Sequence, residues 1–75
     1  STVYLLNRTA PVEGTKTLGV YAEKMDAVAA AHDDANYEQS ENYPGNSLEY
    51  GVSDTGDDYV TLGSYIWKIT PKVVQ

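Results

Sequence analysis

The chain of 75 residues contains no cysteine, which excludes disulfide bonds and cysteine-ligated metal sites. Its single histidine, His32, has no second histidine with which to complete a zinc site. A domain of this size buries only about 60% of the surface of its unfolded chain, so its hydrophobic core is small. We therefore expect a marginally stable monomer without a cofactor, for which formation of a homo-oligomer is one route to further stability.

Long apolar runs are also absent, since no stretch approaches the roughly 18 apolar residues of a membrane helix. The first residues lack a basic region followed by an apolar run, which predicts that there is no signal peptide. We expect no membrane association and a cytoplasmic location. No phosphate-binding glycine loop and no nucleophile elbow is present, so we expect no catalytic residues and no enzymatic activity.

Lysine and arginine are missing from the whole segment between Asp26 and Asp58, which carries nine of the eleven acids. The five basic residues lie outside it, at positions 8, 16, 24, 68 and 72. Two interpretations remain open: a solvated surface that keeps a small protein in solution, or a face that attracts a basic partner. The net charge of −6 disfavours direct binding of nucleic acid, because phosphate recognition requires a positive patch.

Hydrophobic patterning predicts strands over residues 2–8, 15–22, 47–52 and 59–70, and an alanine-rich helix over residues 23–39. The strand over 2–8 is apolar on both faces, which predicts a central strand covered on both sides. We expect Gly63-Ser64 to bend the last strand and Pro71 to end it. The order β-β-α-β-β predicts one domain over residues 1–75 with an α+β fold, in which one helix packs on a small antiparallel sheet.

Finer expectations concern the inward faces. The helix is expected to turn Met25, Val28, Ala29, His32 and Asn36 inward, with His32 as a structural histidine at the edge of that face. In the second strand, Leu18 and Val20 are expected to face inward or to lie near a bulge at Gly19.

The tripeptide Asp54-Thr55-Gly56 matches the motif that carries the catalytic carboxylate of aspartic proteases. Such a carboxylate needs apolar shielding and a second copy about 3 Å away, and neither is indicated here. A calcium loop needs six or more oxygen ligands, whereas Asp54, Asp57 and Asp58 supply three carboxylates. Asp and Gly are turn residues, so the segment is predicted to be a turn between two strands.

Phenylalanine is absent as well, although the chain has seven tyrosines and one tryptophan. The tyrosine hydroxyl favours half-buried and interface positions, and aromatic residues among charges are typical of protein-binding surfaces. The alternative is that a small domain simply has few deep positions for large side chains. If the tyrosines form an interface, the predicted protein-binding residues are Asp33, Asp34, Tyr37, Glu38, Glu41 and Tyr43.

Three stretches, VYLL (3–6), GVYAEKMDAVAAA (19–31) and YIWKI (65–69), resemble a pattern found in small uncharacterised proteins of bacteria and their phages. The general character of the chain also resembles small accessory proteins of actinobacterial phages. The resemblance covers about a third of the chain and brings no catalytic residue with it. It implies a bacterial or phage origin, and for a phage protein a location in the host cytoplasm.

These observations favour a small acidic, non-enzymatic module that binds a protein, which in a phage setting would be a host protein whose activity is modulated. One alternative is a homo-oligomeric structural or accessory subunit with tyrosines at the self-interface. Another is a DNA mimic that occupies the basic groove of a defence nuclease, although mimics usually carry a denser arrangement of acids.

Overall fold

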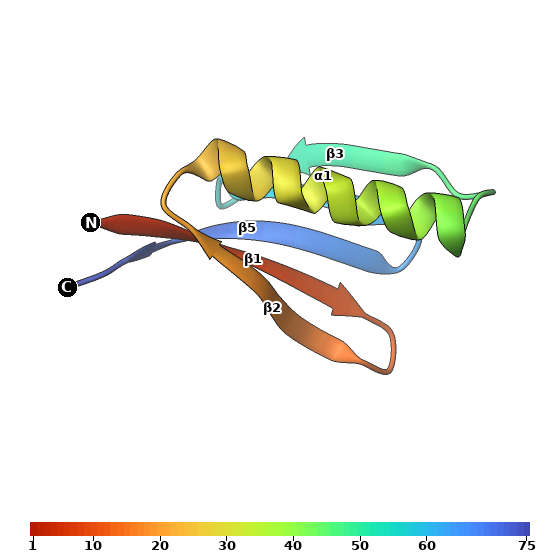
Figure 1. Ribbon diagram of the computed structural model, residues 1–75, viewed down its shortest axis with the longest axis horizontal. Helices are drawn as coiled ribbons and strands as arrows, with labels where there is room; N and C mark the ends of the chain where they lie inside the picture. The colour runs from red at the N-terminus through yellow and green to blue at the C-terminus, as the bar shows by residue number, and fades with distance from the viewer.

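The computed structural model describes residues 1–75 and has one helix packed on a five-stranded antiparallel sheet (Figure 1). The elements are β1 (Thr2–Ala10), β2 (Gly14–Tyr21), α1 (Lys24–Glu41), β3 (Leu48–Val52), β4 (Asp58–Leu62) and β5 (Tyr65–Val73). The predicted α+β fold is confirmed. No helix in the chain is both long and apolar enough to cross a membrane.

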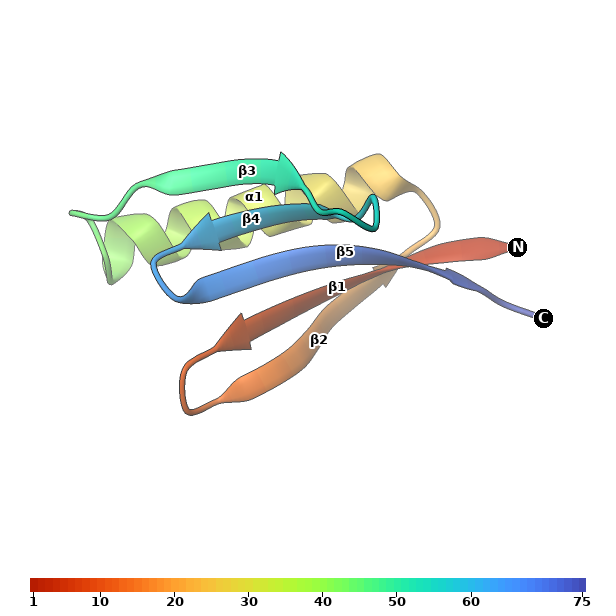
Figure 2. The ribbon, with the colours of Figure 1, turned by 180° about the vertical axis from the view of Figure 1, so that it is seen from behind.

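The strands lie in the order β2-β1-β5-β4-β3, so β5 is central and the two edges are β2 and β3. Seen from behind, the sheet presents a face that the helix does not cover (Figure 2). The prediction that the first strand is covered on both sides is therefore wrong. Both edges of β1 are paired, but Val3 and Leu5 are only half-buried because nothing packs over their face.

The region predicted as one long strand, residues 59–70, is a tight hairpin of β4 and β5. The predicted bend at Gly63-Ser64 is a full reversal, in which Gly63 has the positive φ of 57° that a tight turn requires. Leu62 and Tyr65 face each other across this turn. The reversal adds a strand to the sheet and makes β5 the central one.

The prediction that Pro71 ends the last strand is wrong, because β5 continues to Val73. Val74 donates its backbone N–H to Ser1 over 2.7 Å, and hydrogen-bonded pairs alternate along an antiparallel ladder. Pro71 therefore occupies a non-hydrogen-bonded pair with Tyr4, and its missing N–H would point away from β1. Pairing of β5 with β4 extends only as far as Ile69, opposite Asp58, so beyond this point that side of β5 is a free edge, where proline is tolerated.

The helix packs on the sheet through three small residues at a spacing of four: Ala27, Ala31 and Ala35 are all fully buried. These alanines allow the helix to approach closely, and the volume of the core comes from the sheet, above all from the buried Trp67. The predicted inner face is therefore rotated: Met25 is 70% exposed. Ala29 and Asn36 are also exposed, whereas Val28 and His32 lie at the edge of the buried face.

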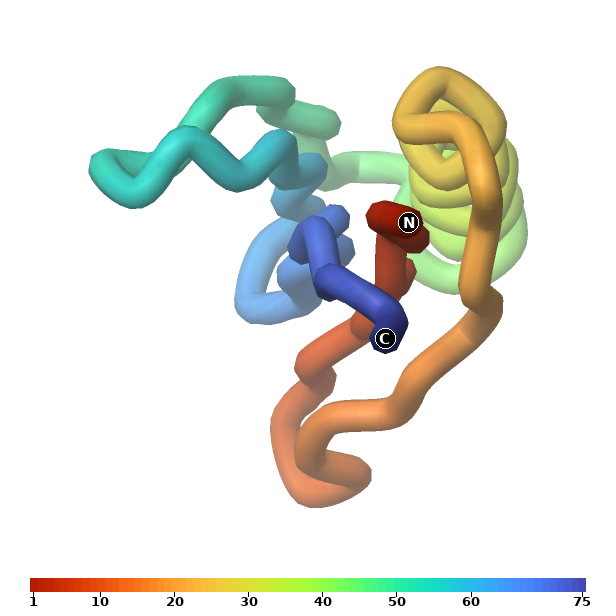
Figure 3. The backbone as a smooth tube through the Cα atoms, turned by 90° about the vertical axis from the view of Figure 1, so that its left-hand side faces the viewer, coloured from red at the N-terminus to blue at the C-terminus, as the bar shows by residue number.

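The edge strand β2 has a register shift opposite Leu6 and Asn7, where Leu18 has no partner on β1. This irregularity agrees with the bulge expected near Gly19. Leu18 and Val20 are both exposed, so the alternative expectation that they face inward is wrong. Viewed end on, the β1–β2 hairpin and the β3–β4 hairpin diverge on either side of the centre, and the two termini lie together (Figure 3).

Candidate functional site

A groove separates the helix from the edge strand β3, because α1 lies over the other strands of the sheet and leaves β3 least covered. The groove has a volume of about 310 Å³. Its lining comes from α1, β3, β4 and β5 and is mostly apolar: Val28, His32, Tyr50, Gly51, Val52, Asp58, Tyr59, Val60 and Ile69. We refer to this feature as the α1–β3 groove.

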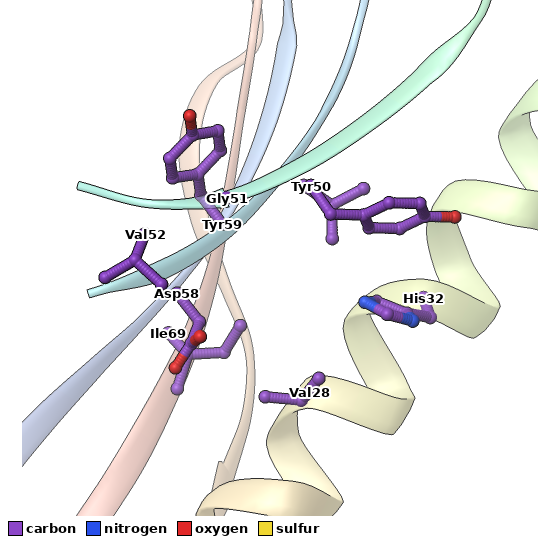
Figure 4. Close-up of a pocket in the computed structure, with 9 residues that line it drawn as sticks. Val28, His32, Tyr50, Gly51, Val52, Asp58, Tyr59 and Ile69 are labelled. Carbon is purple, nitrogen blue, oxygen red and sulfur yellow. The ribbon is translucent and has the colours of Figure 1, made fainter. Parts of the chain in front are cut away.

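One end of the α1–β3 groove is closed by an aromatic contact between the helix and the edge strand. The rings of His32 and Tyr50 lie 4.5 Å apart, centroid to centroid, at an angle of 45°. Figure 4 shows Val28 and His32 reaching from the helix toward the strand that carries Tyr50. The predicted structural role of His32 at the helix edge agrees with this contact. Tyr50 remains 53% exposed, so its ring is also available to a partner.

The other end of the α1–β3 groove carries an ion pair. The ammonium group of Lys24, at the start of the helix, lies 2.7 Å from Oδ2 of Asp58. That oxygen is buried, and the ammonium group compensates its charge. Hydrogen bonding with Asp58, followed by the negative charge of that carboxylate, raises the pKa of Lys24 above its ordinary value. Lys24 belongs to α1 and Asp58 to β4, far apart in the sequence, and the fold brings the two side chains together.

The outer edge of β3 is unpaired, since this strand is the last in the sheet. In the adjoining turn Ser53 donates its N–H to the carbonyl oxygen of Asp57 over 2.8 Å, which fixes the alternation of the ladder. Gly51 and Glu49 therefore direct their backbone groups toward β4. The backbone N–H and C=O groups of Leu48, Tyr50 and Val52 point outward, where no strand satisfies them.

Tyr59 holds β3 in place from the opposite face of the sheet, away from His32 (Figure 4). Tyr59 and Gly51 are cross-strand partners, and the Tyr59 ring covers the glycine. A Cβ atom at position 51 would lie only 2.5 Å from the Tyr59 hydroxyl oxygen, so a side chain would displace the ring. This arrangement gives a short edge strand a defined position beside the groove.

The turn that follows β3 contains the aspartic-protease-like tripeptide. Gly56 donates its N–H to the carbonyl oxygen of Ser53 over 2.9 Å and has a φ of 86°. These features are those of a three-residue hairpin loop with glycine in the left-handed region. The prediction of a turn is confirmed. No group of three His, Asp or Glu side chains in the chain has a geometry that would hold a metal ion.

The six residues predicted to bind protein separate into two groups. Asp33, Tyr37 and Glu41 are exposed and follow each other at a spacing of four, so they form one row along the helix, which we call the acidic ridge. By helical periodicity the acidic ridge lies on the flank of the helix away from His32, and hence away from the α1–β3 groove.

Asp34 contributes to internal contacts instead. Its Oδ2 accepts a hydrogen bond of 2.7 Å from Nε1 of the buried Trp67 and one of 3.2 Å from the guanidinium group of Arg8. Arg8 also lies 4.0 Å from the carboxylate of Glu13. The carboxylate of Asp34 thus links the helix to β1 and β5.

Glu38 and Tyr43 also contact their own chain. Glu38 accepts a hydrogen bond of 2.8 Å from the side-chain amide of Asn42. The rings of Tyr43 and Tyr65 lie 5.5 Å apart. Hydrogen bonding with Tyr43, followed by burial and by the negative charges of Glu13 and Glu38, raises the pKa of Tyr65 to about 12.

A second hollow, of about 420 Å³, lies on the uncovered face of the sheet. It is lined by Thr9, Ser53, Tyr59, Thr61, Ile66 and Lys68. Its one charged group, the ammonium of Lys68, lies 3.7 Å from the carboxylate of Asp57. The hollow has fewer apolar walls than the α1–β3 groove and no free strand edge beside it.

Sequence reasoning missed Tyr50 and Val52 as site residues, although it placed both on the correct face of the strand. Val52 is 62% exposed and Tyr50 is more than half exposed, which is unusual for residues on the helix side of a sheet. The feature of the sequence that could have identified them is that these large apolar residues lie in a strand of only five residues. Only the strand order reveals that this strand is an edge.

Comparisons of the chain with protein-family models, with curated proteins and with solved structures give no match.

Proposed function

We propose that this chain is a non-enzymatic module that binds a basic protein partner, and that the α1–β3 groove is its main contact surface. The observation that carries the proposal is the combination, in one place, of an apolar hollow and an unpaired strand edge. Apolar pockets with aromatic walls are where protein interfaces concentrate their binding energy.

The charge distribution supports a basic partner. β3 and all but the first two residues of α1 lie in the segment between Asp26 and Asp58, which contains no lysine or arginine. Lys24, the one basic residue of α1, is paired with Asp58. The acidic ridge lies on the other flank of the same helix. It is well placed to speed the approach of a basic partner, because long-range attraction acts on association more than on dissociation.

The capture of proteins from a bacterial lysate tests this function when the intact chain is compared with two matched variants. Tyr50→Ala removes the aromatic wall of the groove, and Tyr37→Ala removes a similarly exposed tyrosine from the acidic ridge. We expect a partner that the intact chain and Tyr37→Ala retain and that Tyr50→Ala loses. A partner lost only with Tyr37→Ala would instead assign binding to the acidic ridge.

A second candidate function is that of a homo-oligomeric structural or accessory subunit. The observation in its favour is the uncovered face of the sheet, on which Val20 and Ile66 are exposed. Sedimentation at micromolar concentration separates the two candidates. A stable monomer of 8.2 kDa would exclude the oligomeric subunit, and a dimer disrupted by Ile66→Lys would support it.

A further inference from the structure

The unpaired edge of β3 is a template for another strand. Leu48, Tyr50 and Val52 each present an outward N–H and C=O, as the alternation of the β3–β4 ladder requires. Exposed edges of this kind are used by proteins that bind an extended peptide as an additional strand, in which main-chain hydrogen bonds supply affinity.

The α1–β3 groove runs beside this edge. The side chains of Tyr50 and Val52 point into the groove, so a strand added next to β3 would direct every second side chain over the same hollow. A volume of about 310 Å³ is ample for one large apolar side chain. The walls that such a side chain would meet are mostly apolar and include Val28 and Ile69.

The charges around the α1–β3 groove indicate which kind of segment would bind there. Residues 47–58 contain four acids and no base. Asp57 and Asp58 are paired with lysines of this chain, whereas Glu49 and Asp54 form no ion pair. A segment with lysine or arginine would complement these two carboxylates. A second copy of this chain would instead bring together two molecules with a net charge of −6 each, which disfavours self-pairing at this edge.

Given the proposed function, we infer that the partner contributes an extended segment that pairs with β3 as an additional strand. One large apolar side chain of that segment sits in the α1–β3 groove, and lysine or arginine residues flank it.

The probe for this inference is a synthetic capped peptide with the pattern Lys-Thr-Lys-Leu-Lys-Thr-Lys, titrated into the intact chain and into two variants. Val52→Pro removes an outward N–H without breaking a hydrogen bond to β4, because Val52 lies in a non-hydrogen-bonded pair with Asp58 and proline is tolerated at such edges. Val52→Ala removes most of the same side chain and keeps the N–H. Thermal unfolding of each variant checks that the fold is retained.

We expect Val52→Pro to weaken binding of the peptide up to about tenfold, as the loss of one main-chain hydrogen bond predicts, and Val52→Ala to weaken it by less than about threefold. A second probe, methylated on the backbone nitrogens of the leucine and its two neighbours, keeps every side chain and charge. Because the methyl groups block the centre of both edges of the peptide, we expect it to bind at least about tenfold more weakly than the parent peptide.

Equal binding of the parent and methylated peptides, or no binding of the parent at millimolar concentration, would overturn strand addition. The proposed function would still stand if a captured partner distinguished Tyr50→Ala from Tyr37→Ala. If no captured partner made that distinction, the α1–β3 groove would also be wrong as the contact surface.

Discussion

The indole N–H of Trp67 donates a hydrogen bond of 2.7 Å to the carboxylate of Asp34, which joins the centre of the sheet to the helix. Trp67 is fully buried, so its N–H has no access to water. We expect Asp34→Ala to lower the free energy of unfolding by about 2 kcal/mol, because it leaves a buried donor unsatisfied and Arg8 without its partner. Urea unfolding measures the change.

The matched control is Asp33→Ala, one residue earlier on the exposed side of the helix. It removes the same charge without breaking a contact, so we expect the free energy of unfolding to change by no more than about 0.5 kcal/mol. Equal losses of stability in the two variants would show that the Asp34 contacts do not stabilise the fold.

The tip of the β1–β2 hairpin is strained. Val12 has a positive φ of 70°, and the N–H of Glu13 donates to the carbonyl of Pro11 over 2.7 Å, which closes a three-residue turn. A β-branched residue is disfavoured in this conformation by about 1–2 kcal/mol. Val12 is fully exposed, so no packing is lost when it is replaced. We expect Val12→Gly to raise the free energy of unfolding by about 1 kcal/mol.

Val12→Ala is the control for this variant, since alanine has a Cβ atom and meets the same restriction at positive φ. We expect it to stabilise the chain less than Val12→Gly does. Thermal or urea unfolding measures the stability of both variants. A Val12→Gly variant no more stable than Val12→Ala would mean that the turn is unstrained in solution.

Because of the contact between Tyr43 and Tyr65, the free energy of unfolding depends on pH in the alkaline range. Tyr65 has a pKa of about 12 in the folded chain against 10.0 ordinarily, so the folded state retains a proton that the unfolded state releases. This contribution is fully present below pH 10 and is lost as the pH rises through about 12. We expect unfolding experiments to show a steeper alkaline loss in the intact chain than in Tyr65→Phe.

Tyrosinate absorbance gives an independent measurement of the same relationship. Because hydrogen bonding with Tyr43 is the largest cause of the shift, Tyr43→Phe should lower the pKa of Tyr65 toward its ordinary value. A titration step near pH 12 that persists unchanged in Tyr43→Phe would contradict this assignment.

The acidic ridge is expected to act on the rate of association. Charges beyond a Debye length of about 8 Å at physiological salt are screened, so steering weakens as salt rises. We expect the double variant Asp33→Asn, Glu41→Gln to bind a basic partner more slowly and with a flatter dependence on salt. Asn36→Ala, a neutral change on the same helix, should leave both unchanged. Unaltered association kinetics in the double variant would leave the acidic ridge as a solvated surface only.

Local patterns predicted most elements of the fold, since alternation and helix propensity depend on near neighbours. The predictions failed where long-range packing decides. The face of the helix was assigned by its larger side chains, yet Ala27 and Ala31 turn inward because Trp67 fills the space beneath them. Pro71 was expected to end a strand, and only the position at which β4 stops explains why it does not.

The candidate site was less predictable than the fold. Asp34 and the acids of the ridge look alike in the sequence, and only tertiary contacts distinguish a carboxylate that holds Trp67 from one that is free for a partner. Tyr50 becomes a candidate because the strand order makes β3 an edge and the helix leaves it uncovered. Both facts depend on contacts between distant parts of the chain.

The rate at which a captured basic partner dissociates from the intact chain, Tyr50→Ala and Tyr37→Ala is the most direct test of the central claim. If the α1–β3 groove is the contact surface, Tyr50→Ala loses about 2 kcal/mol of binding free energy, which is roughly a thirtyfold faster dissociation. Tyr37→Ala then dissociates within about threefold of the intact chain. Fast dissociation of Tyr37→Ala, with Tyr50→Ala unchanged, would contradict the claim.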